Sequence, residues 1–157
     1  MIHTRRVSRP FMEKIMLVIT QVNGCRYCSY FHTQMALTSG ISETEIEQLM
    51  ALEVGDFPPE QAVALAYAQH YAESGCCPEP EAEQRFRLYY GPQISADIMN
   101  TIRMIKMGNL AGNTVDAFLS RLKGAPAPGS SILWEATFFF LSMPVIVPLL
   151  IKMRNSG

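Results

Sequence analysis

A break at Asn23-Gly24 between two apolar, periodic segments is the feature that most constrains this 157-residue chain. Over residues 11–22, apolar side chains recur at the spacing of an amphipathic helix. Glycine often lies just past a helix end, so this helix should stop at Gly24. A second helix is expected over 25–38. Two helices joined by so short a turn predict an antiparallel hairpin.

The second of these segments opens on two cysteines three residues apart, with a histidine four residues further on. If the segment is helical throughout, Cys28 lies one turn from both Cys25 and His32. The spacing also puts the two cysteine Cα atoms roughly 5–6 Å apart, within the range of a disulfide. The pattern therefore predicts a redox dithiol with a base beside it.

A single acidic residue, Glu13, interrupts the apolar pattern of the first segment. In an antiparallel hairpin, Glu13 and His32 would each lie about 12–15 Å from the turn, at 1.5 Å per residue. The carboxylate could then bind one imidazole nitrogen, fix the tautomer and make the other nitrogen a better base. That nitrogen would face Cys28, one turn away, so we expect Cys28 to be the nucleophile.

The spacing of Glu13, Cys25, Cys28 and His32 resembles the signature of the alkylhydroperoxidase D (AhpD) family, within the carboxymuconolactone decarboxylase-like superfamily. The similarity extends over about residues 9–123. It implies an all-α, AhpD-like helical bundle built from antiparallel helix hairpins, assembled as an obligate trimer or hexamer. It also implies that the second cysteine reacts with peroxide and that the first resolves it.

What this resemblance implies is a thiol-dependent (alkyl) hydroperoxide reductase of antioxidant defence, with the Glu13–His32 pair as its proton relay. No cofactor is expected beyond the redox-active disulfide of Cys25 and Cys28 and an external dithiol reductant. The reductant implied is of the lipoyl or thioredoxin type, with a peroxiredoxin as a further partner. Some family members carry a histidine before the second cysteine, where this chain has Tyr27.

Three other interpretations of the same residues stay open. The first is a disulfide reductase or redox sensor of the superfamily without efficient peroxidase turnover. The second is a carboxymuconolactone decarboxylase-type enzyme, although the resemblance argues against it because those enzymes do not depend on two such cysteines. The third is a zinc site, because Glu13, Cys25, Cys28 and His32 are four conceivable ligands. Structural zinc sites usually draw their ligands from loops, so we expect no metal here.

Charge and the N-terminal residues indicate which partners and which cell compartment to expect. The 13 basic and 14 acidic residues are dispersed, with a net charge of −1, which argues against nucleic-acid binding. Residues 1–6 are polar and do not resemble a secretory signal. We therefore expect a cytoplasmic protein, where two cysteines at this spacing are more often redox-active than structural.

Further helices are expected along the rest of the chain, and no segment shows the alternation of a strand. The chain is predicted to comprise an N-terminal arm (1–9), the helical domain with the dithiol (10–124) and an apolar C-terminal extension (125–157). The predicted helices of the domain cover 43–52, 58–73, 79–90, 92–107 and 114–122, with an interruption or kink at 108–113.

The C-terminal extension contains 21 residues, 131–151, with a single charge at Glu135. This length meets the requirement for a membrane span of about 20 residues. The competing interpretation is that the extension packs on a neighbouring subunit.

Three side chains outside the main motif carry reactive groups. His70 is expected at a helix surface or subunit seam. Cys76 and Cys77 are expected to be ordinary thiols in a loop, with an intersubunit disulfide or a second redox pair as the alternatives.

Overall fold

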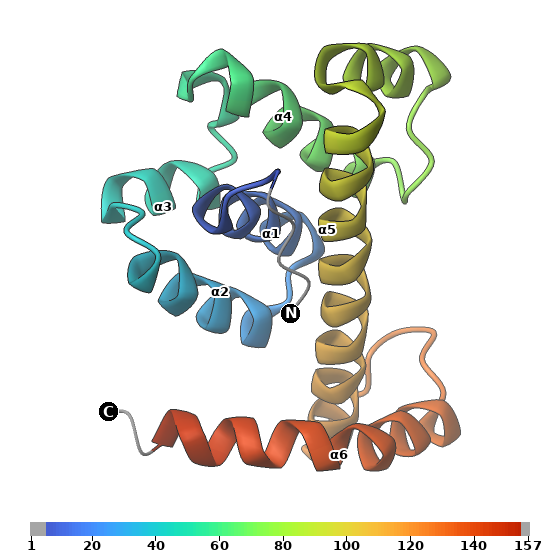
Figure 1. The fold of residues 1–157 in the computed structure, drawn as a ribbon. Helices are drawn as coiled ribbons and strands as arrows, with labels where there is room; N and C mark the ends of the chain where they lie inside the picture. The colour runs from blue at the N-terminus through green and yellow to red at the C-terminus, as the bar shows by residue number, and fades with distance from the viewer. Residues whose placement is uncertain (1–5, 155–157) are drawn as a thin grey trace. The chain divides into compact units, whose positions relative to one another are not determined.

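The structure is a computed structural model that describes residues 6–154, with side chains over 6–144. Every regular element in this range is helical, which confirms the predicted all-α class (Figure 1). The elements are α1 (Arg9–Asn23), α2 (Arg26–Thr38), α3 (Glu43–Met50), the 3-10 turn η1 (Val54–Asp56), α4 (Pro59–Glu73), α5 (Pro80–Leu122) and α6 (Ile132–Arg154).

The chain divides into two compact units, and the boundary falls inside α5. The first unit runs to Asn109 and the second begins at Leu110. The predicted division at 124–125 lies within the second unit. The predicted functional boundary between the helical domain and the C-terminal extension stays a prediction.

Local signals at both ends define α1. Ser8 caps its first turn, where its hydroxyl accepts a hydrogen bond from the Phe11 amide at 3.4 Å, and Pro10 occupies a position that needs no amide hydrogen. Gly24 ends the helix with φ of 65°, a left-handed conformation that glycine adopts without steric cost. The predicted end at Gly24 is therefore confirmed.

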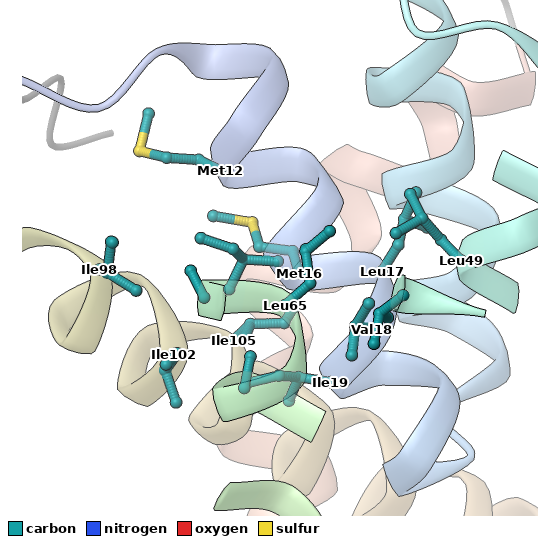
Figure 2. Packing of buried hydrophobic residues seen from close by; sticks show 14 of the residues in the cluster. Met12, Met16, Leu17, Val18, Ile19, Leu49, Leu65, Ile98, Ile102 and Ile105 are labelled. Carbon is teal, nitrogen blue, oxygen red and sulfur yellow. The ribbon is translucent and has the colours of Figure 1, made fainter. Parts of the chain in front are cut away.

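Other helices of the first unit surround α1, which carries much of its core. α2, α3 and α4 all pack on it (Figure 1). Nine consecutive residues, 12–20, are buried, as expected for a helix enclosed by others. Side chains from α3, α4 and α5 complete the core, and they include Leu49, Leu65, Ile98, Ile102 and Ile105 (Figure 2).

A capping box opens α3. The Ser42 hydroxyl accepts from the Glu45 amide at 3.2 Å, and the Glu45 carboxylate accepts from the Ser42 amide at 3.2 Å. The same carboxylate binds the buried Lys14 of α1 at 2.5 Å. Glu45 thus ties the start of α3 to the central helix.

The predicted helix end near Gly91 is correct in position, because α5 bends there. Gly91 has φ of 72° and ψ of 172°, outside helical geometry, and Pro92 follows it. The predicted interruption at 108–113 is wrong, since α5 continues through these residues. Glycine and asparagine only weakly disfavour helix, and tertiary contacts override that preference. Asn109 makes such a contact with α1, described below.

Part of the predicted N-terminal arm packs on its own chain. Val7 is buried, and the Arg6 guanidinium donates to the Asp97 carboxylate at 2.8 Å. Residues 1–5 lie outside the described residues.

The second unit joins the end of α5 to α6. The Phe118 and Phe139 rings lie 4.7 Å apart, and Arg121 pairs at 2.7 Å with Glu135, whose side chain is 2% exposed. No helix in the described part of the chain has both the length and the apolarity needed to cross a membrane. The side chains at 145–151, which complete the predicted span, lie outside the described ones.

Candidate active site

The α1–α2 hairpin brings Glu13 and His32 together. The Glu13 carboxylate lies 2.8 Å from Nδ1 of His32. Glu13 is 1% exposed, and the His32 ring is the side chain that its carboxylate binds. An ionised carboxylate only accepts, so Nδ1 carries the proton in this hydrogen bond. In neutral His32, Nε2 is then the basic nitrogen.

Cys25 does not lie inside the helix as predicted. It is the N-cap of α2, with extended φ and ψ of −82° and 97°, and its sulfur accepts from the Cys28 amide at 3.4 Å. The reason is Gly24, whose left-handed backbone delays the start of the helix to Arg26. The helical-wheel relation of Cys25 to His32 is therefore wrong, although Cys25 and Cys28 still meet.

The two sulfurs of the dithiol lie 2.7 Å apart. Cys25 is buried, Cys28 is partly buried, and each carries a thiol. The hydrogen bond with Cys25 raises the pKa of the Cys28 thiol above its ordinary value, burial raises it further, and a backbone hydrogen bond offsets only part of this. Two adjacent sulfurs, one buried and one partly buried, cannot both ionise readily, so the pair retains a proton.

His32 lies one helical turn from Cys28. The two residues are four apart in α2 and share one face of the helix. Cys28 is also in the first turn, where the partial positive charge of the helix N-terminus stabilises an anion. A base held by a carboxylate, a thiol one turn away and a second thiol in contact can perform thiol–disulfide chemistry.

The zinc alternative finds no support among the described residues, where no three His, Cys, Asp or Glu side chains are grouped to hold a metal ion.

The other reactive side chains lie away from the dithiol. His70 of α4 binds the Glu79 carboxylate through Nε2, and both residues line a pocket of about 530 Å³ between α4 and the start of α5. Cys76 is partly buried and Cys77 is exposed, and neither is bridged. No residue of the dithiol site lines this pocket.

The sequence pattern does not reveal the pairing of four polar residues that connect α5 to the end of α1. Thr20 binds Asn109 at 3.1 Å, and Lys106 binds Asn23 at 2.7 Å. The available signal was polar side chains on otherwise apolar helix faces. Asn109 was instead interpreted as a helix breaker.

Comparison with known proteins places this geometry in a family. The profile of the carboxymuconolactone decarboxylase family matches residues 2–70. The uncharacterized protein YdfG of Bacillus subtilis (strain 168) is 31% identical over 106 residues, which cover 66% of this chain and 71% of YdfG. The chain belongs to the carboxymuconolactone decarboxylase family. The segment matched by the carboxymuconolactone decarboxylase profile contains Glu13, both cysteines of the dithiol and His32. No solved structure matches the chain.

Proposed function

We propose that this protein is a thiol-dependent hydroperoxide reductase, with Cys28 as the peroxide-reactive residue. The observation that supports this most is the Glu13–His32 hydrogen bond of 2.8 Å one helical turn from a pair of thiols in contact. A buried carboxylate needs a partner, and here its partner is the imidazole that can act as base. Family membership supports an enzyme of this superfamily.

The first step oxidises Cys28. Nε2 of His32 takes the thiol proton, and the Cys28 thiolate attacks the terminal oxygen of the hydroperoxide. The O–O bond breaks, the sulfur becomes a sulfenic acid, and the alkoxide takes the proton from His32 and leaves as an alcohol. The carboxylate of Glu13 stabilises the transient imidazolium.

The second step closes the disulfide. The Cys25 thiol condenses with the Cys28 sulfenic acid, and water leaves. Because the sulfurs already lie 2.7 Å apart, little movement is needed. An external dithiol of the lipoyl or thioredoxin type then reduces the bridge by exchange and leaves as a disulfide. The homo-oligomer, a peroxiredoxin partner and a cytoplasmic location belong to the same proposal.

Steady-state hydroperoxide consumption tests the function, with dihydrolipoamide or reduced thioredoxin as the electron donor. Cys28→Ser should abolish both turnover and trapping of a sulfenic acid by dimedone. Cys25→Ser should consume one equivalent of peroxide and retain a trappable sulfenic acid. Cys77→Ser, which alters an exposed thiol outside the site, is the control and should match the wild type. Turnover of disulfides without turnover of hydroperoxide would instead favour a disulfide reductase.

A further inference from the structure

Two side-chain hydrogen bonds connect α5 to the end of α1, immediately before the dithiol. Lys106 Nζ donates to Asn23 Oδ1 at 2.7 Å, and Thr20 Oγ1 donates to Asn109 Oδ1 at 3.1 Å. Lys106 and Asn109 lie one turn apart on α5, as Thr20 and Asn23 do on α1. The four side chains therefore form two neighbouring cross-links between the helices.

These cross-links flank the turn that carries Cys25. The backbone carbonyl of Thr20 accepts from the Cys25 amide at 3.4 Å, and Asn23 is separated from Cys25 only by Gly24. Cys25 is 1% exposed and, as the cap of α2, it lies outside both helices. Its backbone position is thus governed by a short turn whose α1 side is held by α5.

Stability alone does not account for the buried pair. Thr20 and Asn109 are each 1% exposed, and Nδ2 of Asn109 has no hydrogen-bond partner among the described residues. A buried donor without a partner costs free energy, and two apolar side chains of similar shape would avoid that cost. A polar pair fixes one arrangement of the two helices, which apolar contacts do less strictly.

We propose that Lys106 and Asn109 are positioning residues that set the redox equilibrium of the Cys25–Cys28 dithiol. The cross-links hold the Cys25 turn so that the dithiol already has its sulfurs in contact, and little freedom remains to be lost when the disulfide forms. This rests on the proposed function only in treating the two cysteines as a redox couple; it does not require reaction with peroxide.

The relevant equilibrium is exchange with glutathione disulfide. A thiolate of the pair attacks the glutathione disulfide and expels glutathione thiolate, and the second thiolate then attacks the mixed disulfide and expels another. The pair loses two electrons and two protons, and two glutathione thiols form. Without a cross-link, the dithiol gains freedom that the disulfide must give up, so its equilibrium constant for disulfide formation should fall about tenfold. For this two-electron couple, that change is a midpoint potential about 30 mV less negative.

The test is the midpoint potential of the full-length protein, measured in glutathione redox buffers by alkylating the remaining thiols. Lys106→Met should make the midpoint potential less negative, by the amount that corresponds to an equilibrium constant for disulfide formation about tenfold lower. Lys106→Arg should retain the wild-type potential. The double variant Thr20→Val/Asn109→Leu removes both partners of the buried bond without leaving either unpaired, and should shift the potential in the same direction.

Thr101→Val is the matched control, because this buried hydroxyl of α5 donates to the Asp97 carbonyl of its own helix, at 3.1 Å, and does not link α5 to α1 among the described residues. It should leave the potential unchanged. A wild-type potential in both Lys106→Met and the double variant would overturn the proposal, as would a dithiol that glutathione disulfide does not oxidise. A normal couple that consumes no hydroperoxide would refute the peroxidase instead and leave this test intact.

Discussion

Replacing Glu13 by glutamine should slow the oxidation of Cys28. Glu13→Gln keeps a side chain of the same shape that can still accept from Nδ1 of His32, but it removes the charge. Charge-assisted hydrogen bonds are roughly twice as strong as neutral ones, a difference of about 1–1.5 kcal/mol. Since about 1.4 kcal/mol corresponds to tenfold in rate, oxidation of Cys28 should slow about tenfold.

A graded series extends this prediction. Glu13→Ala removes the hydrogen bond as well as the charge, a loss of up to about 3 kcal/mol, so the rate should fall by up to about a hundredfold. His32→Ala removes the base itself. General acid–base catalysis typically contributes about 10²–10⁴-fold to a rate, so the rate should fall by a factor of that order. The rate would be measured by stopped-flow reaction of the reduced protein with hydroperoxide, with the fold checked by circular dichroism.

A double-mutant cycle separates positioning from general damage. Because Glu13 is proposed to act only through His32, Glu13→Gln should have no further effect in the His32→Ala background. Glu45→Gln is the matched control, since it also removes a carboxylate partner of an α1 side chain, Lys14, but lies outside the dithiol site. Wild-type rates for both Glu13 variants in a folded protein would refute the proton relay.

Three further predictions concern pH. Since the hydrogen bond with Cys25 is the largest cause that raises the pKa of Cys28, Cys25→Ala should lower it, and iodoacetamide should alkylate Cys28 at lower pH than in the wild type; an unchanged profile would contradict this. Burial raises the pKa of Tyr90 to about 12, so the stability that its neutral hydroxyl contributes is complete below pH 10 and lost as the pH rises towards 12. An ultraviolet titration should show a phenol that ionises near this pH and that is lost in Tyr90→Phe. The hydrogen bond from Arg121 lowers the pKa of Glu135 below its ordinary value of 4.5. The pair therefore stabilises the second unit fully above pH 4.5, and this stabilisation is lost as the pH falls through the lowered pKa. Arg121→Met should abolish that acid transition in thermal unfolding.

The α1–α2 hairpin could be predicted because its determinants are local. Gly24 ends one helix, the capping signals are adjacent in sequence, and similar distances from the turn bring Glu13 level with His32. The predicted start of α2 at Cys25 missed only that a left-handed glycine leaves the next residue as a cap. Spacing alone cannot distinguish these two positions, because both bring the sulfurs together.

The contacts from α5 could not be predicted in the same way. Lys106 and Asn109 reach partners 83 and 89 residues earlier in the chain, and no local pattern encodes such a pairing. Gly108 and Asn109 have weak helix propensities that suggested a break, whereas packing against α1 keeps the helix continuous. The error therefore fell on Asn109, one of the two α5 residues that contact the end of α1.

Cys28 as the peroxide-reactive residue is tested most directly by mass mapping of all four cysteines after the reduced protein reacts with one equivalent of hydroperoxide. One disulfide should form between Cys25 and Cys28, and Cys76 and Cys77 should remain alkylatable. Oxidation confined to Cys76 or Cys77, or an untouched Cys28 after the peroxide is consumed, would contradict it.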